Sequence, residues 1–330
     1  MIQFCNRQEA IRRMNQWGAE SSPFLFLIDY AQETCLVERL EEIDPQEIQF
    51  NLNGSTNQPE GRTKPLRRPF SWHVHPLQES QYRQSFQQVV DAIHAGNSYL
   101  VNLTAPTPVE TDLTLLEIFQ RSEARYKLWV KNHFVVFSPE IFVRICEGQI
   151  SSYPMKGTID ARIPQAEQII LQDEKEAAEH ATIVDLIRND LSQIATHVHV
   201  ARYRYIDRLE THHGPLLQVS SEVTGTLPAT TWQSCVGDLL FTLLPAGSIT
   251  GAPKPKTLEI IAKAEGYERG FYTGVMGIYD GKQLDSAVMI RFMEQQGERM
   301  LFKSGGGITA KSDCHKEYEE LIQKIYVPIY

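Results

Sequence analysis

A single lysine in a polar turn stands out as a candidate nucleophile. Lys156 lies in residues 153–158 (YPMKGT), just after a strand-like run, and Glu140 closes another apolar run sixteen residues upstream. A lysine on an irregular turn that leaves a sheet can attack an electrophilic carbon, while a nearby carboxyl supplies a proton to the leaving group. The alternative is a solvated turn lysine and a capping glutamate, because most loop lysines are exposed. The hexapeptide by itself leaves both interpretations open.

Carboxylates are spaced to share a helix face at two places in the chain. Glu176 and Glu179 are three residues apart, and such a pair can hold a hard cation such as Mg²⁺. The alternative is an acidic first turn that complements the helix dipole. Near the C-terminus, Glu317, Glu320 and Lys324 also share one face. There Glu320 is a candidate metal ligand and Lys324 a candidate substrate anchor, and the alternative is an ordinary surface ion pair.

Two further features are suited to binding an anion. Residues 304–307 (SGGG) connect a predicted strand to the segment before the last helix, and consecutive glycines let backbone N–H groups approach an anion closely. A flexible turn would have the same composition. Arg291 lies within the apolar run 287–292, where a guanidinium can hold a carboxylate through two hydrogen bonds. The alternative is that strand alternation points this arginine to solvent.

The elements that must position these residues follow from hydrophobic spacing. Helices are predicted at residues 82–94, 113–121, 175–195, 234–243, 255–265 and 315–325. Strands are predicted at residues 24–30, 99–104, 126–137, 140–147, 149–152, 196–205, 216–226, 274–279, 286–293 and 300–303. The polar, partly basic residues 51–68 predict a loop. Because the strands do not alternate regularly with helices, we expect an α+β (mixed α/β) fold with antiparallel sheets and helices packed outside.

Composition excludes several classes of function. The chain has 330 residues and a formal net charge of −9, so no basic surplus is available for non-specific nucleic-acid binding. Its five cysteines are scattered without C-x-x-C spacing, which is typical of reduced thiols and gives no zinc signature. No signal-peptide pattern and no apolar run long enough to span a bilayer is present. These features predict a soluble, cytoplasmic protein.

Three sequence blocks resemble the signatures of the chorismate-utilising enzymes. They are residues 183–190 (IVDLIRND), 244–254 (LPAGSITGAPK) and 304–308 (SGGGI), of which the second is highly specific. The resemblance covers roughly residues 80–327 in the right order, and the region before it is shorter than is usual in the family. It implies a fold in which antiparallel sheets form a central β-sandwich. We therefore expect a chorismate-binding catalytic domain at residues 76–330, preceded by an N-terminal region, residues 1–75, that belongs to the same fold.

Two positions indicate the branch of the family. Lys156 stands where anthranilate synthases carry alanine, and it resembles the aminodeoxychorismate branch, in which that lysine attacks the substrate ring. Leu100 stands where isochorismate and salicylate synthases carry a general-base lysine, and leucine cannot activate water. The Leu-Leu-Glu-Ser motif associated with tryptophan feedback is also absent from the N-terminal region. The resemblance thus implies amination of chorismate to 4-amino-4-deoxychorismate, on the way to 4-aminobenzoate and folate.

The resemblance also implies roles for individual residues. Lys156 matches the nucleophile and Glu140 the general acid that protonates the departing C4 hydroxyl. Glu179 and Glu320 match the Mg²⁺ ligands of the family, with Glu176 near the ion. The positions that match contacts to the substrate ring and its two carboxylates are Gly157, Thr158, Ser248, Tyr272, Arg291, Gly305, Gly307 and Lys324.

Two positions depart from the pattern of the amine-using members. They generally carry glutamine where Leu100 lies, and histidine where Leu217 aligns, although His212 and His213 lie a few residues earlier. These departures keep two alternatives open: an enzyme like anthranilate synthase component I, or a non-catalytic chorismate-binding subunit. The four residues Lys156, Glu140, Glu179 and Glu320 together favour the enzyme.

The expected partners are chorismate, ammonia and a separate glutamine amidotransferase subunit. None of the five cysteines lies in the Gly-x-Cys-x-Gly context that a glutaminase nucleophile needs. The chain is therefore expected to receive ammonia rather than to produce it.

Overall fold

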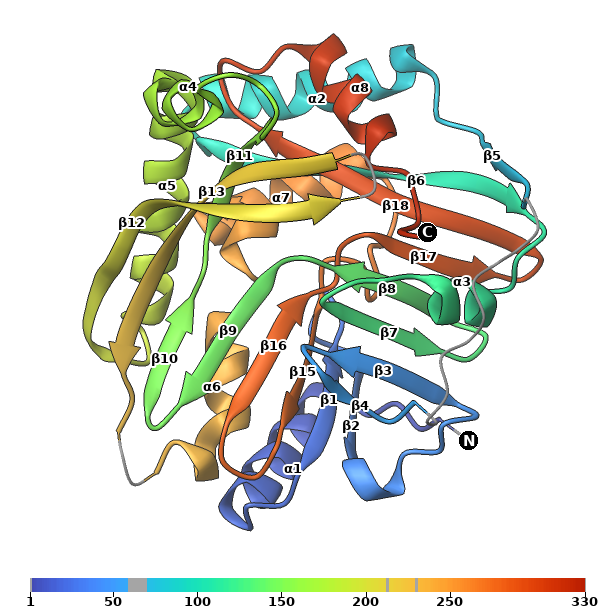
Figure 1. Ribbon diagram of the computed structural model, residues 1–330, viewed down its shortest axis with the longest axis vertical. Coiled ribbons are helices and arrows are strands. Elements are labelled where there is room, and N and C mark those ends of the chain that lie inside the picture. The colour runs from blue at the N-terminus through green and yellow to red at the C-terminus, as the bar shows by residue number, and fades with distance from the viewer. Residues whose placement is uncertain (1, 59–69, 212–213, 229–230, 330) are drawn as a thin grey trace.

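The computed structural model describes residues 2–58, 70–211, 214–228 and 231–329 (Figure 1). These residues form two antiparallel sheets of nine strands each. The first sheet has the order β11 (Met155–Asp160), β13 (Gly214–Thr226), β10 (Gln149–Ser152), β9 (Ile141–Cys146), β16 (Leu284–Val288), β15 (Val275–Tyr279), β1 (Phe24–Ile28) and β2 (Cys35–Arg39), with β12 (Thr196–Thr211) beside β13. The second has the order β14 (Gly251–Ala252), β6 (Leu100–Thr111), β18 (Arg299–Ile308), β17 (Phe292–Gln296), β8 (Phe134–Ser138), β7 (Tyr126–Val130), β3 (Ile48–Leu52) and β4 (Ser55–Thr56), with β5 (Trp72–Val74) beside β6.

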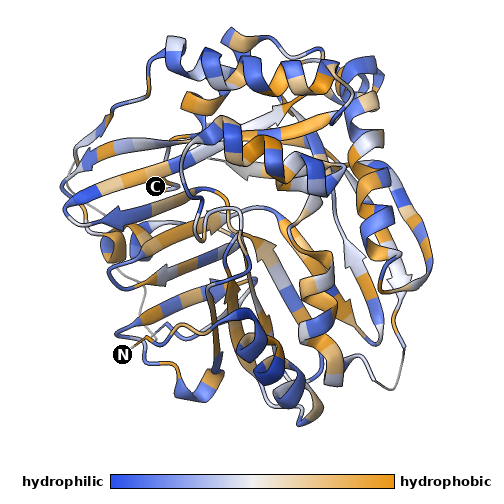
Figure 2. Cartoon of the chain, turned by 180° about the vertical axis from the view of Figure 1, so that it is seen from behind, coloured by the Kyte–Doolittle hydropathy of each residue, from blue (hydrophilic) through white to orange (hydrophobic). Residues whose placement is uncertain are grey.

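Helices cover the outer faces of both sheets. In the described part of the chain they are α1 (Arg7–Ala19), α2 (Glu79–His94), α3 (Leu115–Arg121), α4 (Ala166–Gln172), α5 (Glu174–Leu191), α6 (Val236–Leu243), α7 (Lys254–Glu265) and α8 (Cys314–Gln323). Helices α1, α5 and α6 contribute to one hydrophobic cluster with the first sheet, and α2, α7 and α8 to another with the second. Seen from behind, α1 is mostly hydrophilic on its outer side, whereas many interior strand residues are hydrophobic (Figure 2). None of these helices is long and apolar enough to cross a membrane.

The core between the sheets explains why β1 is apolar at every position. Successive strand residues point to opposite faces. Phe24, Phe26 and Ile28 pack toward α1 and α6, while Leu25 and Leu27 pack against strands of the second sheet. Both faces of the strand are buried, so alternation is lost and all five residues are fully covered. The predicted α+β fold, with two packed antiparallel sheets and helices outside, is confirmed.

The N-terminal part of the chain contributes strands to both sheets. β1 pairs with β15 and β2 in the first sheet, while β3 pairs with β7 in the second. The polar segment predicted as a loop at residues 51–68 includes the end of β3 and the short strand β4, and its residues 59–68 lie outside the described residues.

Four local predictions were wrong. The predicted strand 126–137 is a hairpin of two strands, β7 and β8, that pair with each other. The predicted strand 286–293 is two strands, because the chain leaves the first sheet after β16 and enters the second at β17, with Arg291 at φ 54° between them. The glycines predicted to form a connection belong to β18 and pair along β6. A Cβ on Gly305 would lie 2.5 Å from the Leu103 carbonyl oxygen, so this close approach of strands requires glycine. Lys156 likewise lies on strand β11 rather than on a turn.

Candidate active site

Lys156 lies where the edge of the first sheet meets the second. β11 is an end strand that pairs with β13 and has a register shift at Gly157, whose φ is +76°. Lys156 Nζ is 3.2 Å from Glu179 Oε2 on α5. A Cβ added to Gly307 would lie 3.9 Å from the same Nζ and 3.0 Å from Leu100 Cδ1. The missing side chain at Gly307 therefore leaves room for the lysine over β18 and β6.

Glu140 and Arg291 lie at two neighbouring crossings between the sheets. The chain passes from β8 to β9 at Glu140 and from β16 to β17 at Arg291. The crossings are joined by backbone hydrogen bonds: Phe137 N donates to the Arg291 carbonyl over 3.1 Å, and Val288 N donates to the Glu140 carbonyl over 3.0 Å. Side chains that are distant in sequence are thus held side by side by the sheets.

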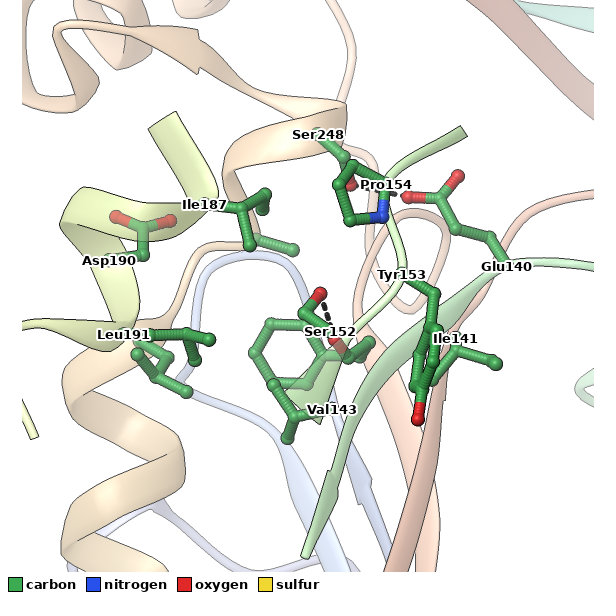
Figure 3. Close-up of a pocket in the computed structure, with 13 residues that line it drawn as sticks. Glu140, Ile141, Val143, Ser152, Tyr153, Pro154, Ile187, Asp190, Leu191 and Ser248 are labelled. Atoms are coloured by element: carbon green, nitrogen blue, oxygen red, sulfur yellow. Dashed lines mark hydrogen bonds between the residues drawn. The ribbon is translucent and has the colours of Figure 1, made fainter. Parts of the chain in front are cut away.

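Burial of the Glu140 carboxyl group favours its protonated form. Ser248, in the short helix η3 (Gly247–Ile249), donates a hydrogen bond to Glu140 Oε1 (Figure 3). Burial raises the pKa of Glu140, while the Ser248 hydrogen bond and the charges of Lys156, Lys324 and Arg291 oppose that rise. A carboxyl with a raised pKa beside cationic groups can donate a proton to a leaving hydroxyl.

Four glutamates from two helices form the acidic side of the site. Asp173 caps α5 by accepting a hydrogen bond from Glu176 N, which places Glu176 and Glu179 in the first turns of that helix. Glu317 and Glu320 of α8 lie next to Gly306, because a Cβ there would be 3.5 and 3.6 Å from their carboxylate oxygens. Burial raises the pKa of Glu176 and of Glu317, and the neighbouring carboxylate in each helix adds to the rise.

Cationic and aromatic side chains adjoin these glutamates. Lys324 Nζ lies 2.6 Å from Glu320 Oε1 and donates to the Gly305 carbonyl over 2.8 Å. The Arg291 guanidinium lies over the Tyr326 ring at 5.2 Å. Tyr272 is buried, and burial raises its pKa well above the ordinary value. These groups can hold the carboxylates and ring of a small anion.

The remaining predicted residues are less close to this centre. Thr158 is exposed on β11, and Leu217 lies on β13 opposite Ile159. Leu100 does lie beside Lys156, and both line a surface cavity of about 1330 Å³ together with Glu179. His212 and His213 lie outside the described residues.

Sequence reasoning gave no role to three residues that the structure places close by. Glu317 repeats on α8 the i, i+3 spacing seen on α5, and this repetition was the available signal. His180, 1% exposed, makes a 2.7 Å hydrogen bond to Ser221, and burial lowers its pKa to about 4. Arg269 is 3% exposed and donates to the carbonyls of Ile249 and Asn102, which fixes η3 against β6. No sequence pattern identifies those long-range partners.

The four glutamates fit a hard cation by their chemistry. Mg²⁺ prefers carboxylate oxygens and usually retains waters and substrate oxygens in its shell. In the described residues no group of three or more His, Cys, Asp or Glu side chains is close enough to form a complete cage. Glu179 is instead engaged by Lys156 and by Lys175, the latter at 3.7 Å. The arrangement suits an open site completed by substrate rather than a closed structural one.

Comparison with known proteins identifies the family. Residues 10–329 match the family described as chorismate binding enzyme. A Haemophilus influenzae protein named "Uncharacterized PabA-like protein" is 50% identical over 322 residues, covering 98% of this chain and 97% of that protein. Aminodeoxychorismate synthase component 1 of Salmonella typhimurium is 30% identical over 281 residues, covering 79% of this chain and 60% of that protein.

A solved structure supports the fold. MenF, the menaquinone-specific isochorismate synthase of Escherichia coli, has a TM-score of 0.72 with 16% sequence identity, covering 96% of this chain and 80% of that chain. At this identity the likeness concerns the fold alone. The family match across nearly the whole chain shows that the protein belongs to the chorismate-binding enzyme family.

Proposed function

We propose that this protein aminates chorismate at C4 to give 4-amino-4-deoxychorismate, with ammonia delivered by a separate glutamine amidotransferase, in the pathway to 4-aminobenzoate and folate. The observation that carries the proposal is the position of Lys156, whose Nζ projects over Gly307 within range of the Glu140 charge. Lysine at this position resembles the aminodeoxychorismate branch, in which it attacks the substrate ring, whereas anthranilate synthases carry alanine there.

The first chemical step joins lysine to substrate. Lys156 Nζ, as the neutral amine, attacks a ring carbon conjugated with C4, the ring double bonds shift, and the C4–O bond breaks. Glu140 gives its proton to the departing hydroxyl, which leaves as water. Hydroxide is a poor leaving group, so this proton transfer lowers the barrier to displacement. The adduct nitrogen keeps its proton as an ammonium group, so that it can later leave the ring as a neutral amine, and Glu179, 3.2 Å from Lys156 Nζ, stabilises its positive charge.

The second step releases the product. Ammonia attacks C4, the double bonds shift back, and the bond from the ring to Lys156 breaks. The Glu140 carboxylate left by the first step accepts a proton from the new C4 ammonium group. The acid is thus regenerated and the lysine returns as an amine, so the enzyme ends in its starting state.

The charge of the substrate is offset by groups on both sides. Chorismate carries two carboxylates, and Arg291 and Lys324 supply positive charge near Glu140. Glu179 and Glu320, with Glu176 close by, would hold Mg²⁺, which adds positive charge against a substrate carboxylate. The exposed Thr158 is proposed to contact the substrate only at the mouth of the site.

The direct test is to incubate the purified chain with chorismate, Mg²⁺ and ammonium and to resolve the products by mass. A product in which an amino group replaces the C4 hydroxyl is expected. Isochorismate would have the same mass as chorismate, and anthranilate would have lost the enolpyruvyl side chain. Either of those products, or none, would contradict the proposal.

Removing a predicted metal ligand should stop turnover without unfolding the protein. Glu179→Gln and Glu320→Gln are expected to lose both activity and Mg²⁺ binding measured by calorimetry, while Tm stays nearly unchanged because neither side chain is in the core. Glu319→Gln is the matched control, since Glu319 is 55% exposed on α8 and pairs with His315 instead. Full activity in excess chelator would contradict the metal assignment.

The nitrogen source should be free ammonia when the chain acts alone. At ammonium concentrations that limit the second step, the rate is expected to rise with pH as more ammonium becomes NH₃, until loss of the Glu140 proton slows adduct formation. Glutamine is expected to give no product, because no glutaminase cysteine context is present in the sequence. Adding the amidotransferase subunit should make glutamine a substrate. Product formed from glutamine by the single chain, with ammonium excluded, would overturn the need for a partner.

A further inference from the structure

We propose that a small internal cavity behind Glu140 is the binding site for ammonia, an inference that rests on the proposed amination. The cavity has a volume of about 20 Å³ and lies between Glu140 and Ser248 on one side and Asp190 on the other (Figure 3). A space of this size admits one water-sized molecule, since about 10–15 Å³ is the minimum for water. Ammonia has nearly the same size and hydrogen-bonding capacity.

The lining of the cavity favours the neutral form of the ligand. Most of its wall comes from the apolar side chains of Ile141, Phe142, Val143, Ile187, Leu191, Leu243 and Ala246. Ser152 also lines it, but its hydroxyl donates to the Phe142 carbonyl over 2.9 Å. Before the first step of the proposed reaction, Glu140 holds its proton and Asp190 is paired with Lys254, so ammonium entering the cavity would lose its hydration without a free counter-ion, whereas NH₃ loses little. The neutral molecule is the form that can attack carbon.

The position of the cavity matches the second chemical step. Glu140 lines it and is the group that has given its proton to the C4 hydroxyl. An ammonia molecule held there lies next to the carboxylate that must take its proton as the N–C4 bond forms. The same residue therefore serves the leaving group and the incoming nucleophile from adjacent positions.

Asp190 connects this cavity to the protein surface. It also lines a second cavity of about 570 Å³, formed with Gln193, Thr242 and Lys254. Asp190 Oδ2 is 2.8 Å from Lys254 Nζ, with only 10% and 16% of the two side chains exposed. The same oxygen would be 2.9 Å from a Cβ on Gly247, the residue before Ser248. Asp190 thus lines both spaces while its partner Lys254 lines the outer one, and we infer that ammonia enters from the outer one.

The outer cavity adjoins the larger surface cavity that Lys156 and Glu179 line, because Leu186 of α5 belongs to both linings. Asp190 lies eleven residues after Glu179 on α5, which is about three helical turns, or roughly 16 Å along the axis. The proposed entry of ammonia at Asp190 is therefore displaced along α5 from the Lys156 end of the site.

Filling the cavity should weaken ammonia use alone. In Ala246→Val, the two added methyl groups fill the space that the ligand would occupy. The Michaelis constant for ammonium is therefore expected to rise on the order of tenfold or more. The Michaelis constant for chorismate and the rate of adduct formation on Lys156 without ammonium should stay unchanged. Ala264→Val is the control, since Ala264 is also buried but lies in the separate core under α2 and α7.

Enlarging the cavity should widen the choice of amine. Val143→Ala is expected to accept methylamine and give the N-methylated product, detected by mass, which the wild type should not make. Val236→Ala, also fully buried but not in the lining, is the control and should also reject methylamine. If the Michaelis constant for ammonium is unchanged in Ala246→Val, or if the wild type uses methylamine, the cavity is not the ammonia site. A wild type that forms no aminated product from ammonium would instead overturn the proposed function.

Discussion

Replacing Lys156 with alanine is expected to abolish both the aminated product and a covalent adduct that the wild type forms. Under single-turnover conditions without ammonium, intact-mass analysis of the wild type should show an added mass equal to chorismate less one water. Lys156→Ala has no amine to attack the ring, so neither species should be detected. Its Tm should change little, because Lys156 lies on an end strand with 29% of its side chain exposed.

Two controls separate nucleophilic chemistry from loss of charge. Lys156→Arg keeps a cation beside Glu179, but a guanidinium stays protonated and cannot act as the neutral amine, so it should be as inactive as the alanine variant. Lys175→Ala removes a different cation from the same carboxylate and should retain the adduct, because Lys175 is 56% exposed on α5. Wild-type turnover with no adduct in a rapid quench would count against the covalent step.

Glu140→Gln is expected to slow adduct formation by about 10²–10⁴-fold, the usual contribution of a positioned general acid. Glutamine keeps the acceptor for the Ser248 hydroxyl but has no proton to give. The adduct-forming rate of the wild type should fall as pH rises through the pKa of Glu140, and burial places this fall above the ordinary glutamate range. The residual adduct-forming rate of Glu140→Gln should not fall over the same pH range.

Ser248→Ala tests the direction in which the Ser248 hydrogen bond shifts the pKa of Glu140. The hydroxyl of Ser248 donates to the Glu140 carboxylate and so stabilises its charged form, which lowers the pKa of the acid. Removing it should move the fall in rate to higher pH, with single-turnover rates measured across the pH range. A shift to lower pH would show that Glu140 does not carry the proton.

Much of the fold could be predicted because hydrophobic spacing is a local property. The helix at α7 and the strand at β10 were located to within a residue, since their apolar positions recur at the expected periods. Helix α1 was not predicted, because its buried residues Ala10, Met14 and Gly18 and its partly buried Ile11 and Trp17 are separated by charged and polar side chains. Its burial depends on a distant partner, α6, that local spacing does not identify.

The candidate site was predictable as a set of residues but not as an arrangement. The resemblance to the family named Lys156, Glu140, Glu176, Glu179 and Glu320. It did not show that the glycines of β18 are a paired strand, because Gly305 takes its conformation from the approach of Leu103 on β6. Likewise, the role of Arg269 in holding η3 depends on carbonyls far away in sequence.

Because Glu140 and Arg291 lie at the crossings, the geometry of the candidate site depends on how the two sheets are oriented relative to each other. Each residue belongs to backbone that is tied to one sheet on its N-terminal side and to the other on its C-terminal side. A small rotation of one sheet against the other would therefore move Glu140 and Arg291, the proposed acid and the proposed carboxylate anchor, relative to Lys156, which belongs to the first sheet alone. Substitutions in the core between the sheets, such as at Leu27 or Phe292, are therefore expected to lower the turnover rate, although neither residue is among the proposed substrate contacts.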